Sequence, residues 1–234
     1  MIKYVLFDLD GTLLPMDQEA FVGAYFGALA KKLAPYGYES EGLVKAIWQG
    51  MGAMIKNDGS ATNEERFWGV FDAVYGDRAR ADKWVLDEFY ERDFDKIKEV
   101  CGFDKRARAV LDLVKERGFI PVLATNPVFP PLATERRMGW AGLTPSDFAL
   151  FTHYENSRHC KPNVAYYEDI LSHLGADATE CVMVGNDVRE DMVARTLGMR
   201  VFLLTPCLIN KDGEDIEKFP HGDFDALLSF ISGL

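Results

Sequence analysis

The chain has 234 residues, enough for one large core or for a core domain with a small insertion. An apolar fraction of 48% with 27% charged residues is ordinary for a globular protein and argues against disorder. The formal net charge of −11 argues against nucleic-acid partners, although local cations and a metal can still bind a phosphorylated metabolite. No apolar run approaches the ~20 residues needed to cross a bilayer. Because acids also interrupt the apolar N-terminal segment, it does not resemble a signal peptide, and we expect a cytoplasmic protein without membrane partners.

The first predicted element is a buried strand that ends in two acids. Residues 2–9 are almost continuously apolar, as expected for a central parallel strand covered on both faces. Asp8 and Asp10 stand where this strand must stop, and Gly11 provides a turn that exposes them. Ligands of open α/β sheets bind outside the carboxyl ends of such strands, so both carboxylates are candidate site residues. The alternative is a strand-ending Asx turn.

The stretch that follows has helical rather than strand patterns. Asp17 is a candidate N-cap for the first of four helices. The predicted helices cover residues 18–33, 42–55, 62–74 and about 80–93. Glycine-containing turns separate them. We therefore expect residues 16–96 to form a helical insertion.

From residue 104 onward, helices and strands alternate. Apolar residues recur at helical spacing in the segments 107–114, 164–174 and 224–231, and the segments 130–138 and 190–197 also read as helices. Predicted strands cover residues 119–125, 148–152, 181–185 and 200–204. This alternation predicts an α/β fold with a doubly wound parallel sheet, which the insertion interrupts after its first strand.

Two further polar segments are candidates for the same sheet edge. Thr125 ends a predicted strand, where its hydroxyl can donate to a phosphoryl oxygen, and Asn126 adds another donor. Lys161 precedes Pro162, which fixes the chain direction at the start of a helix and aims the lysine toward the sheet. Taken alone, the segment at Thr125 is more typical of a common turn, and a lone lysine such as Lys161 is by default a solvated surface residue.

The apolar strand at 181–185 also runs into acids. Asn186, Asp187 and Asp191 follow it. A hard cation prefers an anionic oxygen, which favours Asp187 as a magnesium ligand. Asp191 then lies about one turn further along, where it either assists through water or binds Lys161.

These four segments, in this order, resemble the motifs of the haloacid dehalogenase superfamily. Residues 8–12 read Asp-Leu-Asp-Gly-Thr, as in its first motif, and Thr125 and Lys161 match the second and third. The fourth motif departs from the usual spacing because Asn186 follows Gly185. Asp187 with Asp191 is the favoured register, and Asn186 with Asp191 is the alternative.

The resemblance implies a division of the chain into two domains. Residues 1–15 and 97–234 correspond to a Rossmann-like catalytic core of this superfamily. The helical insertion at 16–96 resembles the cap of the superfamily's first cap class. Such a cap closes over the site and sets substrate choice. Its candidate pocket residues are Met16, Phe21, Tyr25, Trp48, Met51, Met54 and Lys56.

The implied function is a Mg²⁺-dependent phosphatase that acts on a small phosphorylated metabolite through an aspartyl phosphate. Asp8 is the implied nucleophile and Asp10 the general acid and base, with Thr12 helping to orient Asp10 or to bind substrate. Thr125, Asn126 and Lys161 are the implied phosphate-binding residues. The implied metal ligands are the Asp8 carboxylate, the Asp10 carbonyl and Asp187, with Asn186 or Asp191 as alternatives. Dehalogenases of the superfamily lack the second Asp, so the resemblance favours phosphoryl chemistry.

Three other functions are compatible with the resemblance. A phosphosugar mutase uses the same aspartyl phosphate but retains it until the substrate docks again. A phosphonatase requires a cap lysine that forms a Schiff base, and a regulatory protein without activity requires a damaged set of motifs, which this sequence does not have. The exposed cap aromatics can serve either a pocket or a subunit interface, so both a monomer and a homodimer are open.

Overall fold

A computed structural model describes residues 1–234 and contains a five-stranded sheet in the order β2-β1-β3-β4-β5. Its strands are β1 (Tyr4–Phe7), β2 (Ile120–Leu123), β3 (Cys181–Gly185), β4 (Arg200–Leu204) and β5 (His221–Gly222). All neighbouring strands are parallel, which confirms the predicted fold class. The edge strand β5 has only two residues, too few to give a periodic pattern in the sequence.

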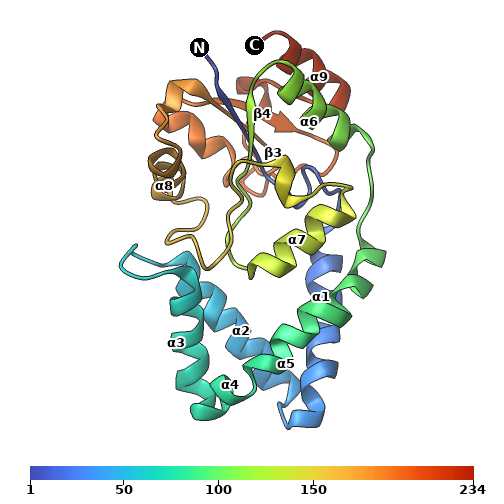
Figure 1. The fold of residues 1–234 in the computed structure, drawn as a ribbon, viewed down its shortest axis with the longest axis vertical. Coiled ribbons are helices and arrows are strands. Elements are labelled where there is room, and N and C mark those ends of the chain that lie inside the picture. The colour runs from blue at the N-terminus through green and yellow to red at the C-terminus, as the bar shows by residue number, and fades with distance from the viewer.

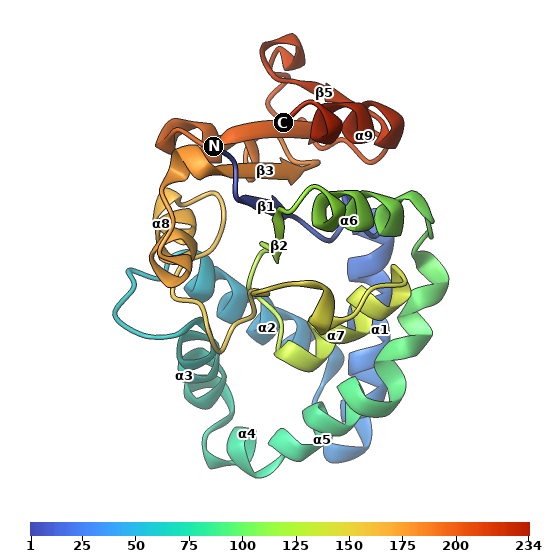
Figure 2. The same cartoon turned by 45° about the horizontal axis from the view of Figure 1, so that its top comes forward.

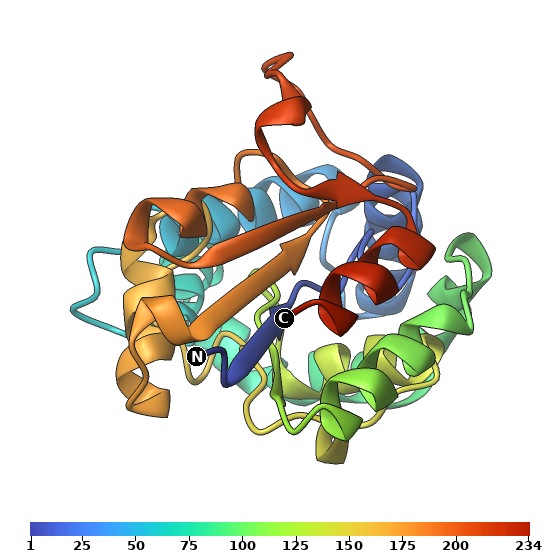
Figure 3. The same ribbon diagram turned by 90° about the horizontal axis from the view of Figure 1, so that it is seen from above.

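Helices cover both faces of the sheet, because the strand side chains alternate between two buried layers. Val5 and Phe7 belong to the layer that includes α6 (Arg106–Glu116) and α9 (Phe224–Ser232). Leu6 lies in the opposite layer with α8 (Val164–Leu174) and the 3₁₀ helix η6 (Met192–Leu197). Figure 3 shows α8 on one side of the strands and α6 with α9 on the other. Short 3₁₀ helices complete the connections at η4 (Pro145–Asp147), η5 (Ala178–Glu180) and η7 (Ile216–Lys218).

The register of the sheet aligns the ends of its three central strands. Phe7 pairs with Leu123 of β2 and with Val184 of β3. Pairing continues one step further, because the Asp8 amide donates to the Val184 carbonyl at 2.9 Å and the Ala124 amide donates to the Phe7 carbonyl at 2.7 Å. The residues that follow these strands therefore meet at one edge of the sheet.

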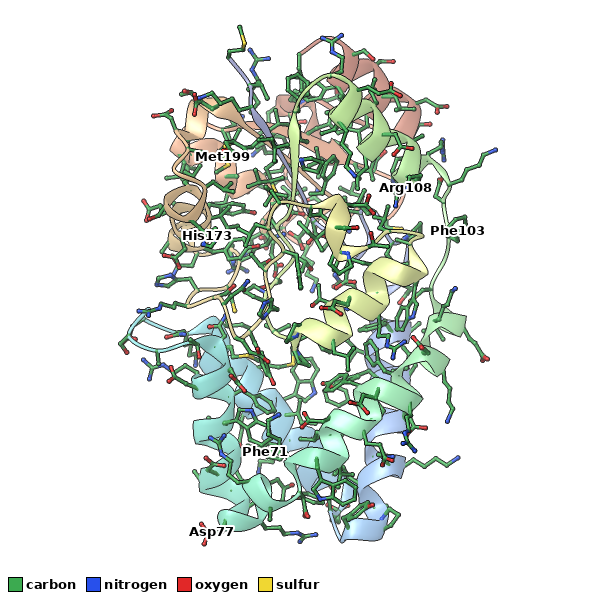
Figure 4. All side chains as sticks on the ribbon, in the orientation of Figure 1. Phe71, Asp77, Phe103, Arg108, His173 and Met199 are labelled. Atoms are coloured by element: carbon green, nitrogen blue, oxygen red, sulfur yellow. The ribbon has the colours of Figure 1, made fainter.

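The insertion forms a helical lobe beyond this edge (Figures 1 and 2). It contains α1 (Gln18–Leu33), η1 (Ala34–Tyr36), α2 (Ser40–Ile55) and α3 (Asn63–Tyr75). Asp17 caps α1 as predicted, with its side chain accepting from the Ala20 amide at 2.9 Å. Figure 4 shows Phe71 within the lobe and Asp77 at the end farthest from the sheet.

The prediction of one continuous fourth helix over 80–93 is wrong. The segment is divided into α4 (Asp77–Ala81), α5 (Lys83–Glu88), the π-helix η2 (Phe89–Asp93) and the 3₁₀ helix η3 (Phe94–Val100). The buried side chains Val85, Phe89 and Phe94 are spaced by four and then by five residues. A π-turn accommodates the spacing of five, so all three side chains face the core of the lobe.

The two segments that connect the lobe to the sheet are bonded to each other. Met16 and Cys101 form an antiparallel bridge, and the Gly102 amide donates to the Pro15 carbonyl at 2.7 Å. These contacts between the two connecting segments lie close to the predicted domain boundaries at residues 15/16 and 96/97. The boundaries themselves stay a prediction.

Three smaller expectations are also corrected. Residues 148–152 run beside β2 but form only one bridge, Leu123 with Phe151, instead of a strand. The helix predicted at 190–197 is a 3₁₀ helix that starts only at Met192, because side-chain caps hold the preceding residues in a turn. Pro162 lies before the N-cap Asn163 of α8 and not in its first turn.

None of the helices has the length and apolar character needed to span a membrane.

Candidate active site

A cavity of about 180 Å³ lies at the sheet edge and is lined by both the core and the helical lobe. The core side is polar and consists of Asp8, Asp10, Thr125, Asn126, Asn186, Asp187, Glu190 and Asp191. Most of the predicted site residues therefore share one cavity. The exceptions are Thr12 and Lys161, which lie behind the cavity wall and are each 1% exposed.

Lys161 holds two carboxylates together beneath the cavity. Its Nζ lies 2.9 Å from Asp8 Oδ1 and 2.7 Å from Asp191 Oδ1. Burial disfavours the ammonium, but the charges of Asp191 and Asp8 outweigh it and hold the pKa of Lys161 well above its usual value. The interpretation of Lys161 as a surface lysine is thereby excluded, and the expectation that Asp191 binds it is confirmed. The ion pairs fix the orientation of the Asp8 side chain.

Thr12 connects the first and fourth motifs. Its Oγ1 lies 3.1 Å from Asp8 Oδ2 and 2.9 Å from Asn186 Oδ1. We expected Thr12 to orient Asp10 or bind substrate, but the turn at Gly11 directs it toward Asp8 instead. Gly11 has a φ of 84°, and a Cβ there would lie 2.3 Å from Asn186 Nδ2, so only glycine fits this turn.

Asp10 is paired with a buried arginine that the sequence reasoning missed. Arg137 belongs to α7 (Pro131–Trp140), which lies between the sheet and the helical lobe in Figures 1 and 2. Its Nη1 donates to Asp10 Oδ2, and the guanidinium lies over the Phe129 ring at 4.4 Å. Burial raises the pKa of Asp10, and the charge of Arg137 offsets part of that rise. A signal was available in the sequence, because Arg137 occupies the apolar face of the helix predicted at 130–138.

Two buried hydroxyl groups bind the backbone of the second motif. Both the Thr152 hydroxyl, at 2.6 Å, and the Tyr166 hydroxyl, at 2.9 Å, donate to the Thr125 carbonyl. The Thr125 side chain is free of such contacts and lines the cavity. Asn126 Nδ2 donates to Glu190 Oε2 at 3.0 Å, and Asn126 Oδ1 is buried without a partner.

Glu190 is a second residue near the site that sequence reasoning missed. It reads as a solvent-facing residue at the start of a helix, yet it lines the cavity, and burial raises its pKa to about 7. The turn at the end of β3 places Glu190 at the cavity. Asp187 Oδ1 accepts from the amides of Arg189 and Glu190 at 2.8 and 2.9 Å, which turns the chain back toward Asn126.

The candidate metal ligands of the fourth motif differ in their free oxygens. Asp191 accepts from Lys161 with Oδ1 and from the Asp187 amide with Oδ2, at 2.9 Å, and is fully buried. Asn186 Oδ1 accepts from Thr12, and its Nδ2 donates to the Cys207 carbonyl at 2.7 Å. Asp187 is partly exposed and keeps Oδ2 free of protein partners, so it has the most accessible anionic oxygen of the three.

The cavity suits a hard divalent cation. Its lining contains five carboxylates and no lysine, arginine or histidine, and Asp10 Oδ1 is buried without a partner. No three carboxylate, imidazole or thiol side chains lie close enough to hold a metal alone. Mg²⁺ is commonly bound by one or two carboxylates together with a carbonyl, water and substrate phosphate, which these residues can provide.

Comparison with known proteins agrees with this site. A sequence model of the haloacid dehalogenase-like hydrolases matches residues 2–195. The chain therefore belongs to this family of enzymes, and the resemblance of its four motifs is confirmed. No sequence among the curated proteins matches the chain.

Solved structures of the same fold include both phosphatases and dehalogenases. A 2-haloacid dehalogenase from Pseudomonas syringae has a TM-score of 0.68 and 22% identity, covering 100% of this chain and 99% of that one. A predicted phosphoglycolate phosphatase from Haemophilus somnus has a TM-score of 0.60 and 18% identity, covering 98% and 97%. A HAD phosphatase from Thermococcus onnurineus has a TM-score of 0.60 and 17% identity, covering 99% of each chain. At these identities the likeness shows the fold alone, and the reaction must be argued from the site.

Proposed function

We propose that the protein is a Mg²⁺-dependent phosphatase that hydrolyses a small phosphorylated metabolite through an aspartyl phosphate on Asp8. The observation that carries the proposal is the presence of a second carboxylate, Asp10, in the same cavity as Asp8. Phosphate-ester cleavage requires both a nucleophile and a proton donor for the departing alcohol. Asp8 and Asp10 supply one of each.

Two contacts hold the Asp8 side chain in one orientation, which supports its role as the nucleophile. Lys161 binds its Oδ1 and Thr12 contacts its Oδ2, so the side chain has little freedom to rotate. In the first step an Asp8 oxygen forms a bond to phosphorus while the bond from phosphorus to the alcohol oxygen breaks. The Thr125 hydroxyl donates to a phosphoryl oxygen, and Asn126 assists it.

Asp10 transfers the proton in both steps. Burial raises its pKa, which favours the protonated form more than in an ordinary aspartate. The resulting carboxylate then takes a proton from water as that water attacks the phosphorus of the aspartyl phosphate. Breaking the Asp8–phosphate bond releases inorganic phosphate and restores both acids. Arg137 holds one Asp10 oxygen throughout, which leaves the other oxygen for this exchange.

A divalent cation is required to bring a phosphate dianion against so many acids. Held by Asp8, the Asp10 carbonyl and Asp187, Mg²⁺ would neutralise phosphoryl charge as the nucleophile approaches. Lys161 cannot neutralise the substrate phosphate by itself, because its positive charge is already balanced by Asp8 and Asp191. Chelation should therefore abolish binding of the substrate phosphate as well as turnover.

The test is to measure phosphate release and halide release on the same preparation. Phosphate monoesters supplied with Mg²⁺ should release phosphate, and 2-chloropropionate should release no chloride. Chloride release without phosphate release would refute the proposal. Isomerisation that depends on a bisphosphate, with slow phosphate release, would indicate a phosphosugar mutase instead.

A further inference from the structure

We propose that the natural substrate is the phosphate monoester of an uncharged, largely apolar alcohol or phenol. The inference rests on the proposed phosphatase function and narrows its substrate class. The geometry behind it is the contrast between the two walls of the active-site cavity. One wall carries the acids, and the other, which faces the leaving group, is apolar.

The helical lobe lines the cavity almost entirely with apolar side chains. They are Met16, Phe21, Val22, Tyr25, Phe26, Trp48 and Met51, and the core adds Val128 and Phe129. Gln18 is the only other side chain that the lobe contributes. We expect a leaving group attached to a phosphate at Asp8 to extend toward this wall, because the opposite wall holds the catalytic acids.

No cationic side chain lines this cavity to receive a second anionic group. Lys56, which we considered for that role, is exposed and does not line the cavity, and Met54 is buried elsewhere. Arg137 is engaged with Asp10, and Lys161 with Asp8 and Asp191. A carboxylate or second phosphate on the leaving group would therefore lose water without gaining a partner, which disfavours its binding. Phosphoglycolate and sugar bisphosphates carry such groups.

The apolar wall continues beyond the cavity. A smaller cavity of about 50 Å³ lies behind it and shares Tyr25, Met51, Val128 and Phe129 with the first. Twelve of its 14 lining residues are hydrophobic. The Tyr25 hydroxyl is hydrogen-bonded to the Tyr90 hydroxyl at 2.8 Å, so it already has a polar partner. Movement of the shared side chains would join the two spaces for a longer apolar substituent.

Trp48 lines the cavity and is also about half exposed, so a charged side chain can replace it there. Its side chain is 49% exposed although it packs on Phe26, with ring centroids 5.4 Å apart. Trp84 is a matched control. It is 53% exposed, packs on Tyr36 at 5.5 Å and lines neither cavity.

The experiment compares two esters that differ only in a remote charge. Hexyl phosphate and 6-phosphooxyhexanoate have leaving alcohols of similar reactivity, so their kcat/KM ratio reports recognition of the far end. We expect kcat/KM to be at least about tenfold higher for hexyl phosphate, because an apolar pocket binds an unpaired charge poorly. Trp48→Arg should narrow or reverse this preference, with about a tenfold gain for the carboxylate ester. Trp84→Arg should leave the ratio unchanged.

Binding of the non-hydrolysable hexylphosphonate and 6-phosphonohexanoate separates this inference from the proposed function. Calorimetry with Mg²⁺ should show the same preference and the same effect of Trp48→Arg. If the phosphonates show it but no ester releases phosphate, the proposed function fails while the ligand class stands. Equal or better use of the carboxylate ester, or a preference that Trp48→Arg does not change, would overturn the inference while phosphatase activity stands.

Discussion

Arg137 donates a charge-assisted hydrogen bond to Asp10 across 127 positions of the sequence. The pair joins α7 to the first motif and leaves one Asp10 oxygen without a protein partner. Arg137 is fully buried, and its Nε also donates to the Ala133 carbonyl at 3.2 Å. It is therefore a positioning residue for the proposed acid and base.

Replacing Arg137 should affect turnover more than substrate binding. Arg137→Met frees Asp10 to rotate, and we expect kcat to fall by about 100-fold, the lower range for losing a general acid or base, with KM nearly constant. Arg137→Lys should recover part of the loss. Arg136→Met is the control, since the neighbouring Arg136 is bonded to Asp95 on the surface. Equal loss in both Met variants would contradict this role.

Asp8→Asn should remove phosphatase activity without unfolding the protein. The Asn oxygen still accepts from Lys161, so the melting temperature should change little, while phosphate release should fall by at least about 1000-fold. Circular dichroism and a phosphate assay check the two parts separately. Activity retained in a folded Asp8→Asn variant would exclude Asp8 as the nucleophile.

The ion pairs of Lys161 make a stability prediction. Lys161→Met leaves Asp8 and Asp191 buried without their cation, and we expect a loss of about 3 to 5 kcal/mol in the free energy of unfolding. The double variant Lys161→Met with Asp191→Asn should recover part of this stability but none of the activity. Urea unfolding measures both variants. A Lys161→Met variant as stable as the parent would contradict the buried network.

Substitutions in the fourth motif should identify the magnesium ligand. Asp187→Asn can still accept from the Arg189 and Glu190 amides, so the turn should persist while Mg²⁺ affinity falls by at least about 100-fold, more than for an outer-shell residue. Asn186→Ala should weaken Mg²⁺ less. Calorimetric titration of the metal measures both, and the reverse order would favour the Asn186 register.

Asp147 should make stability depend on acid pH. Arg108 binds it at 2.6 and 2.7 Å and Lys115 at 2.7 Å, and these contacts, led by Arg108, lower its pKa. Figure 4 labels Arg108 on α6. Because the folded-state pKa lies below the unfolded value of about 3.9, the stabilisation is present above that value and lost as the pH falls through the folded-state pKa.

Asp147→Asn should therefore cost about 2 kcal/mol at pH 7, and the difference from the parent should shrink below pH 4. Unfolding curves measured from pH 7 to pH 2 test this. Asp112→Asn is the control, because Asp112 is 53% exposed and lies 3.7 Å from Arg108. A difference that stays constant with pH would contradict the assignment.

The fold followed from local patterns wherever those patterns were long. The strands predicted at 181–185 and 200–204 and the helix at 18–33 match the structure closely, since burial on one or both faces leaves a regular period in the sequence. The segment at 80–93 did not, because its π-turn follows from packing of Phe89 and Phe94 against the rest of the lobe. The two-residue strand β5 was too short to leave a period at all.

The sequence by itself determined which chemical groups end the strands, because the apolar strand patterns stop at Asp8, Thr125 and Asp187. Parallel strand order and register then bring these three residues to one cavity. Only the tertiary structure decided what each group contacts. Arg137 reaches Asp10 through helix packing, Glu190 reaches the cavity through a capped turn, and neither contact leaves a motif in the chain. Contacts between distant segments depend on three-dimensional distance, which local periodicity does not encode.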